Sequence, residues 1–346
     1  MLMVRHLAAA ALAVGMAALD VEERRAIGSL PAHVAGAFEQ IAECHLTPSG
    51  DYLIFDRRAH AVSTAARGAD VPKKIVQIGA ETGRIIRPTA FDSAPNGTFV
   101  VADTPGNRHR IQFFDVTGSD QGGFTLAGRQ APQIILGDLV LSGIGSLKYT
   151  GESVLISQPD IGALVTEYHL NGATRRTFGQ LRQTGHEKDP AVHAALNIGL
   201  ALPNPKGGYY FVFAAGVPMF RKYDAGGALV FERHVEGLEV DPQLRSLPTA
   251  WPRLAGGEFP IVPAMIRAAA VDPAGNLWIS LSAPYTYVYD SAGDKRRTLQ
   301  FRAAGVVSPT SFFFTRDGRV LISPGCYTFE ALIARAGFKT EGGVRL

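Results

Sequence analysis

The stretch AFDSAPNGTFVVADTPGNRHRIQFFDVTG (90–118) decides the fold, because it contains two β-hairpins in succession. Apolar runs flank the turn Pro95-Asn96-Gly97, and a second pair of strands meets at DVTG (115–118). Gly and Asn accept positive φ and Pro presets the first turn residue, so both turns are typical of tight hairpins. The stretch predicts a unit of four antiparallel strands.

The first hairpin recurs along the whole chain. Its copies are ECHLTPSGDYLIFD (43–56), AFDSAPNGTFVVAD (90–103), SLKYTGESVLIS (146–157), GLALPNPKGGYYFVF (199–213), AAAVDPAGNLWISL (268–281) and SFFFTRDGRVLIS (311–323). Their turn glycines are Gly50, Gly97, Gly151, Gly207, Gly275 and Gly318. A second turn follows at DVTG (115–118), LNG (170–172), DAGG (224–227) and DSAG (290–293), with Gly83 and Gly337 as the counterparts in the first and last units. Repetition on this scale indicates a repeat architecture.

Six four-stranded sheets are too many for one β-sandwich. Arranged radially, they bury both faces against their neighbours and leave only short edges. The sequence therefore predicts an all-β, six-bladed β-propeller of four-stranded antiparallel blades over residues 19–346. Unrelated hairpins in a sandwich or a solenoid are the alternative. The ring could be closed by the C-terminal segment or by a strand from residues 20–38.

One unit also resembles a known family. VADTPGNRHRIQFFDVTG (101–118) is similar to an NHL repeat: a strand ending in Ala-Asp, a loop with Asn and Arg, then Ile-x-x-Phe-Asp and a Gly turn. The other units are degenerate, with Asp56 at the Asp position but Ser157, Ser280 and Ser323 in later units. The resemblance implies a bacterial six-bladed NHL-like propeller.

The N-terminal residues have the pattern of a targeting segment. Arg5 and His6 precede a 13-residue apolar run (7–19), and small residues at 17 and 18 offer a cleavage site. This pattern is typical of a secretory signal peptide, and the run is shorter than the roughly 20 residues of a permanent membrane span. We expect residues 1–18 to be removed and the mature protein to be periplasmic or secreted.

Two long links between blades break the repeat, at 180–196 and 236–263. Asp189 and Pro190 suit the start of a short helix in the first link. In a propeller, connections between blades share one face with the loops joining second and third strands. Both links should therefore lie on the same face, beside the central channel, with Trp251 as a packing or ligand-binding residue.

The chain has two cysteines. Cys44 falls in the innermost strand of the first blade and Cys326 just after the second strand of the sixth, and those blades are neighbours in a closed ring. In an oxidising compartment, a disulfide between them would covalently join the first and sixth blades, where the ring closes. The alternative is two unpaired cysteines, one of them a small apolar filler.

Composition and motifs restrict the function. Lys and Arg total 34 against 31 Asp and Glu, too balanced for an electrostatic nucleic-acid binder. Hydrolase and phosphate-binding motifs are missing, and the nine histidines do not recur at one blade position, which disfavours a three-histidine zinc site. The sequence predicts no cofactor, but it leaves open a calcium ion in the central channel, as in sugar lactonases of this fold. His186, Glu187, Asp189 and His193 form a local cluster that fits a solvated loop better than a metal or acid–base site.

The loops between second and third strands supply the ligand-binding candidates. They are Arg57, Arg58, His60, Asn107, Arg108, Gln158, Asp160, Tyr285, Tyr287 and Tyr327. Arg makes forked hydrogen bonds and Tyr adds apolar area, so such a ring suits a polar or anionic partner. Ordinary surface and bridges between blades are the alternative, above all for Asn107 and Arg108, which the repeat itself uses.

These observations favour a non-catalytic binding propeller that recognises a protein, peptide or saccharide-like ligand on its loop-rich face. A metal-dependent lyase or hydrolase, lactonase-like or amidating-lyase-like, is the first alternative. A structural subunit of a surface complex is the second. One scaffold hosts many functions, so the function has to be argued from the residues of the site.

Overall fold

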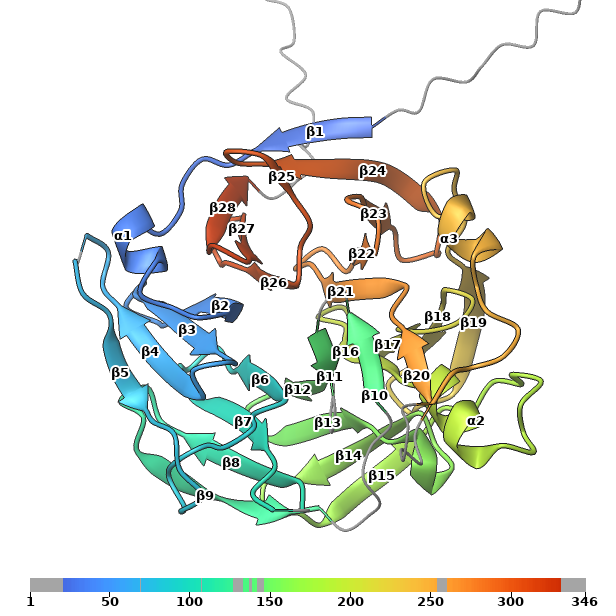
Figure 1. The fold of residues 1–346 in the computed structure, drawn as a ribbon, viewed down its shortest axis with the longest axis horizontal. Helices are drawn as coiled ribbons and strands as arrows, with labels where there is room; N and C mark the ends of the chain where they lie inside the picture. The colour runs from blue at the N-terminus through green and yellow to red at the C-terminus, as the bar shows by residue number, and fades with distance from the viewer. Residues whose placement is uncertain are drawn as a thin grey trace, which may run out of the picture.

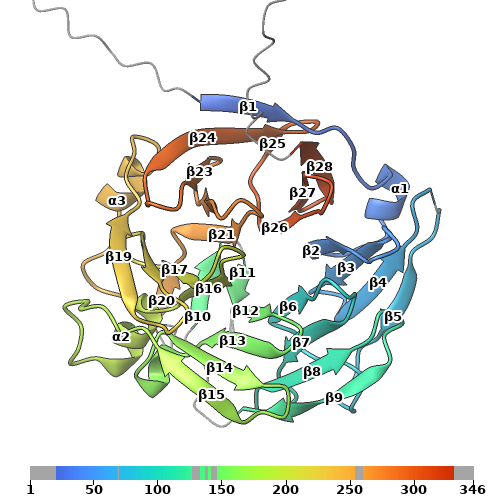
Figure 2. The ribbon, with the colours of Figure 1, turned by 180° about the vertical axis from the view of Figure 1, so that it is seen from behind.

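The computed structural model describes residues 21–68, 70–106, 108–126, 133–136, 139–141, 146–253 and 260–330. They form six antiparallel sheets standing around a common axis, the predicted six-bladed propeller (Figures 1 and 2). Each blade begins with its innermost strand and adds the later strands outward in chain order.

The strands of the first three blades follow the predicted hairpins, with one correction in blade one. Blade one has β2 (Ile41–Leu46), β3 (Tyr52–Asp56), β4 (Ala61–Ala65) and β5 (Lys73–Val76). Its second turn lies between β4 and β5, where Gly68 has positive φ, and Gly83 belongs to the link that leads to blade two. Blade two has β6 (Ala90–Ser93), β7 (Phe99–Asp103), β8 (Arg110–Phe114) and β9 (Asp120–Thr125). Blade three has β12 (Leu147–Tyr149), β13 (Ser153–Ser157), β14 (Val165–His169) and β15 (Thr174–Phe178).

The last three blades are less uniform. Blade four has β16 (Gly199–Pro203), β17 (Tyr209–Phe213), β18 (Met219–Tyr223) and β19 (Leu229–His234). Blade five has β21 (Ile266–Val271), β22 (Leu277–Leu281), β23 (Thr286–Tyr289) and β24 (Lys295–Arg302), extended by β25 (Val306–Val307) and β1 (Val21–Arg25). Blade six has β26 (Ser311–Phe314), β27 (Arg319–Ser323) and β28 (Tyr327–Glu330), and Gly337 of its expected second turn lies outside the described residues.

The first-hairpin turns explain why these strands form. All six turn glycines have positive φ, from 79° at Gly318 to 101° at Gly207, a conformation that costs other residues energy. Between the turns, apolar side chains face the neighbouring blades. The described core therefore divides into one cluster for each seam between blades, with a smaller cluster beside α2 (Pro190–Leu196).

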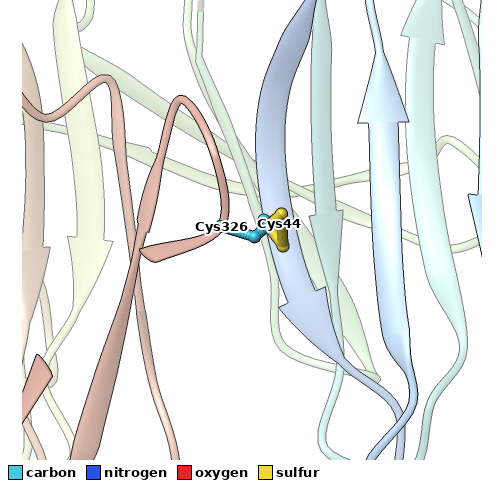
Figure 3. Close-up of a disulfide and its surroundings, with 2 residues drawn as sticks. All are labelled: Cys44 and Cys326. Atoms are coloured by element: carbon cyan, nitrogen blue, oxygen red, sulfur yellow. A yellow bond between two sulfur atoms is a disulfide. The ribbon is translucent and has the colours of Figure 1, made fainter. Parts of the chain in front are cut away.

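The seam between blades one and six holds the smallest of the six seam clusters in the described chain. Blade six contributes only Leu321 and Cys326 to its buried members. Cys326 forms a disulfide with Cys44 there, with Cα atoms 5.5 Å apart across 282 residues of sequence (Figure 3). The covalent bond reinforces the place where apolar packing is thinnest.

The N-terminal segment closes the ring. β1 pairs in parallel with β24 of blade five, and the chain then crosses to blade six (Figure 1). There the Ile27 N–H donates to the Thr328 carbonyl at 2.8 Å, and the Thr328 N–H donates to the Gly28 carbonyl at 2.7 Å. Of the two closures that the sequence left open, this is the one in the described residues. The short helix α1 (Ala32–Ala35) then leads into β2.

The two long links lie together. The Asp189 side chain caps α2, as its sequence predicts, by accepting from the Val192 N–H at 3.3 Å. Arg253, in the second link after α3 (Asp241–Arg245), donates to both carboxylate oxygens of Asp189 at 2.8 and 2.6 Å. Trp251 Nε1 donates to His186 Nε2 at 3.3 Å. These contacts hold the two links together, and His186 and Asp189 of the local cluster take part in them.

A third excursion was not expected from the sequence. Strands β10 (Gln133–Leu136) and β11 (Leu139–Leu141) precede blade three, and β10 pairs in parallel with β20 (Ile261–Pro263) of the second link. The signal was present in QIILGDLVL (133–141), where two apolar runs flank Gly-Asp, a hairpin-turn dipeptide. Figure 1 shows this small sheet over the ring on the side of blades four and five.

Candidate functional site

A cavity of about 550 Å³ opens on the axis, at the loop-rich face where the links enter the blades. We call it the axial cavity. All six innermost strands, or the residues just before them, line it. In chain order, the six blades contribute, among others, Ala42, Ala90, Leu147, Leu200, Ala268 and Ser311. Small side chains at several of these positions leave space around the axis, and ligand pockets of roughly 300–1,000 Å³ are common.

Arg57 brings a guanidinium with a buried, unpartnered donor to the cavity. It follows β3 and lines the cavity, and its buried Nε has no hydrogen-bond partner among the described residues. Its Cζ lies 5.9 Å from the centroid of the Phe55 ring. Burial lowers the pKa of Arg57, while Glu43 acts in the opposite direction. Arg57 was a sequence candidate, and the structure brings it to the axis.

Arg267 reaches the cavity through a strand irregularity. The register of β21 shifts between Ile266 and Ala268, which makes Arg267 the extra residue of a β-bulge. Bulges redirect side chains next to functional sites. Arg267 Nε donates to the Ser282 carbonyl at 3.3 Å, and Arg267 lines the cavity. β2 has a matching shift between Ile41 and Glu43, so blades one and five are both distorted at the cavity.

Lys148 lies deeper along the axis and is already paired. Its Nζ is 3.3 Å from Asp92 Oδ1, and Asp92 Oδ2 accepts from the Tyr149 N–H at 2.8 Å. Burial alone would lower the pKa of Lys148, but Asp92 and Glu43 raise it above its ordinary value. Lys148 and Asp92 also line a smaller cavity of about 290 Å³ toward the opposite end of the inner strands. The ion pair therefore lies between the two cavities.

Glu39 and Glu43 supply the acidic side chains on the wall of the axial cavity. Glu43 Oε2 lies 3.4 Å from Nε2 of His45, and His45 Nδ1 lies 2.7 Å from Ser93 Oγ. The His45 ring also stacks on Phe313 with ring centroids 4.6 Å apart. His45 is thus a buried, hydrogen-bonded residue behind Glu43, and it lines the smaller cavity of about 290 Å³.

Sequence reasoning missed the charged residues of the inner strands. Glu43, Lys148 and Arg267 each interrupt a mainly apolar innermost strand, IAECHL, LKY and IRAAAV. A charge at such a position has to face either the axis or a neighbouring blade. That signal could have pointed to the cavity before the structure was known.

Several sequence candidates have structural roles instead. Tyr287 was expected in a loop, but it lies in β23, fully buried, where its hydroxyl donates to Glu239. Gln158 is buried and accepts from the Tyr168 hydroxyl at 2.6 Å. The rings of Tyr285 and Tyr327 pack against the seam clusters of blades four and five and of blades five and six. Tyr287 and Tyr327 lie within the strands β23 and β28, and not in the loops where the sequence placed them.

The remaining candidates do not line the axial cavity. Arg58 and Arg108 are exposed, Asp160 lies in the turn η1 (Pro159–Ile161), and Asn107 lies outside the described residues. His60 adopts φ +50° in the β3–β4 turn, and burial lowers its pKa. Trp251 packs beside α2.

The NHL-like positions hold the blade together. Asp103 is fully buried, lies 2.6 Å from Arg110 Nη2, and accepts from the Ile86 N–H at 2.9 Å. Asp56 also accepts backbone hydrogen bonds in blade one, from the N–H groups of Glu39 and Gln40. In both blades the Asp holds the link that enters its own blade, which is a structural role.

No protein-family model matches the chain, and no curated protein matches it in sequence. Solved structures do. A streptogramin B lyase is 11% identical with a TM-score of 0.49, covering 87% of this chain and 94% of that one. Virginiamycin B lyase from Staphylococcus aureus is 11% identical with a TM-score of 0.47, covering 83% and 78%. Hydrazine synthase from Kuenenia stuttgartiensis is 12% identical with a TM-score of 0.46, covering 83% and 93%. Likenesses this distant carry no functional conclusion, and the NHL resemblance stays a prediction.

Proposed function

We propose that the protein is an exported binding propeller without catalysis of its own, which holds a polar, anionic ligand in the axial cavity. The loop-rich face is where the sequence analysis expected recognition of a protein, peptide or saccharide-like ligand. Recognition through a central cavity fits a small ligand or the end of a larger one.

The observation that carries this proposal is that Arg57 lines the cavity and that its buried Nε has no hydrogen-bond partner among the described residues. A buried donor without a partner costs about 1–3 kcal/mol, and more for a charged group. An anion that enters the cavity would offer forked acceptors to the guanidinium of Arg57, which lines this space. The second guanidinium, Arg267, faces the same space from blade five.

Export is supported by two independent features. Residues 1–18 have the pattern of a signal peptide. The Cys44–Cys326 disulfide suits an oxidising compartment, because cytosolic thiols are kept reduced. Among the helices in the described part of the chain, none is long and apolar enough to cross a membrane.

A thermal-shift comparison tests the binding proposal. The probes are acetate, N-acetylphenylalanine, galacturonic acid, inorganic phosphate and, as neutral reference, glucose. We expect at least one anion to raise the Tm of the wild type but not of Arg57→Gln. Arg58→Gln is the matched control, since Arg58 is exposed in the same turn and does not line the cavity. Equal shifts in the wild type and Arg57→Gln, or none with any anion, would contradict the proposal. Elemental analysis of the same samples tests the metal-dependent alternative, which stoichiometric calcium or zinc would favour.

A further inference from the structure

The two guanidiniums differ from Lys148 in being open to a ligand. Lys148 has a carboxylate partner at 3.3 Å, and that carboxylate is itself fixed by the Tyr149 N–H. Arg57 and Arg267 form no ion pair with any carboxylate of the described chain, and their hydrogen bonds within it satisfy little of their donor capacity. A guanidinium offers five N–H donors in a planar fork, so two of them can surround one planar anion.

The charges around the cavity favour a ligand with a single negative charge. Three cationic side chains on the wall face two acidic ones, Glu39 and Glu43. Asp92 already neutralises Lys148. A phosphate monoester, or a saccharide with several carboxylates, would bring further negative charge close to Glu43, and like charges repel strongly where water is scarce. A single carboxylate meets the two open guanidiniums without this penalty.

The rest of the cavity is mainly apolar. Phe38, Leu147, Leu200 and Phe312 line it beside several alanines. Gln40, Ser146, Thr310 and Ser311 add polar groups to the wall, and the apolar side chains would bury aliphatic or aromatic surface of a ligand at about 25 cal/mol per Å². The cavity thus combines a carboxylate clamp with an apolar chamber.

We propose that the ligand presents one carboxylate next to an apolar group, with the carboxylate between Arg57 and Arg267 and the apolar group against Phe38 and Phe312. The inference rests on the proposed function and specifies its ligand class. Two sources offer this chemistry: a free organic acid, and the C-terminus of a peptide with an apolar last residue.

Isothermal titration with matched acids and amides tests the inference. N-acetylphenylalanine should bind, and N-acetylphenylalanine amide should bind at least about ten-fold more weakly, as expected for loss of a charged hydrogen-bonded pair. Arg57→Gln and Arg267→Gln should each weaken the acid by about ten-fold or more, with little effect on the amide. Arg57→Lys should recover only part of the loss, because it keeps the charge and loses the fork. Arg58→Gln should bind like the wild type, and far-UV circular dichroism should confirm that every variant is folded.

The peptides Ala-Ala-Ala-Phe with a free and with an amidated C-terminus separate the two sources. Tighter binding of the free peptide than of N-acetylphenylalanine assigns the site to peptide ends, and weaker binding assigns it to free acids; both support the clamp. Equal affinity for acid and amide, or tighter binding of inorganic phosphate than of any carboxylate, would overturn it. A neutral or cationic compound that competes with N-acetylphenylalanine for the cavity would overturn the carboxylate clamp and the anionic character of the ligand, while leaving a binding function of the cavity standing. No binding by any of these compounds at millimolar concentration would overturn both.

Discussion

Glu167 shows how this protein places charge between blades. Its side chain is only 3% exposed, yet it accepts from Ser153 Oγ at 2.8 Å, Arg175 Nη1 at 3.0 Å and Arg176 Nε at 2.7 Å. Arg176 also donates to the Ala225 carbonyl at 2.7 Å and so ties blade three to blade four. Burial alone would raise the pKa of Glu167, but these hydrogen bonds and both arginines lower it below its ordinary value.

This lowered pKa predicts a pH-dependent contribution to stability. A carboxyl whose pKa falls on folding stabilises the native state above its unfolded pKa, and the contribution disappears as pH falls through the folded pKa. Glu167→Gln should therefore reduce the free energy of unfolding by about 1–3 kcal/mol at neutral pH. The difference from the wild type should shrink on acidification below the ordinary glutamate pKa. Urea denaturation across pH measures both.

Glu152→Gln is the matched control, because Glu152 is exposed in the turn that precedes Ser153. It should leave stability nearly unchanged at every pH. A difference between Glu167→Gln and the wild type that stays constant from neutral to acid pH would contradict this account of Glu167.

Among the elements, the N-terminal segment crosses from blade five to blade six. Backbone hydrogen bonds between residues 27–28 and Thr328 hold this crossing in place. The Ile27 N–H donates to Thr328, while the Ile27 side chain is 56% exposed. Ile27→Pro removes the donor and should open this closure, with a loss of about 1 kcal/mol or more. Hydrogen exchange in residues 324–330 should accelerate, and exchange in β7 and β8 should not change.

Ile27→Ala separates the hydrogen bond from the side chain. It keeps the N–H and removes a mostly exposed apolar group, so exchange near Thr328 should stay slow. Equally fast exchange in both variants would show that the ring is closed by side-chain packing and not by this backbone pairing.

The elements also show what the sequence could predict. Turn glycines such as Gly97 and Gly275 act locally, so their spacing predicted the six blades. The axial cavity depends on the closed ring, which brings Arg57 of blade one and Arg267 of blade five to the same space, and no local pattern contains that juxtaposition. Tyr287 was misplaced for a related reason: its burial depends on Glu239, from a link whose path the repeat does not specify.

On the scale of the whole molecule, each blade packs only against its two neighbours. The interface with the least packing is therefore the one where we expect the ring to open first. The disulfide spans the seam with the smallest apolar cluster in the described part of the chain, and it joins residues 282 positions apart. Cys44→Ser should lower the free energy of unfolding by about 2–4 kcal/mol. Guanidinium denaturation measures this loss. Cys326→Ser and the double variant should lose about the same amount, since either change removes the one bond.

The disulfide also lies next to the wall of the axial cavity. Cys44 lies between Glu43 and His45 on β2, and Gly325, next to Cys326, lines the axial cavity. Loss of the bond should therefore weaken ligand binding in addition to stability. Unchanged affinity for N-acetylphenylalanine in a folded Cys44→Ser protein would show that the wall of the cavity is independent of the seam.

The most direct test of the account is a crystal structure of the wild-type protein soaked with N-acetylphenylalanine. We expect density in the axial cavity, with the carboxylate within hydrogen-bond distance of both Arg57 and Arg267 and the ring against the apolar wall. A compound bound elsewhere while the axial cavity holds only water would contradict it.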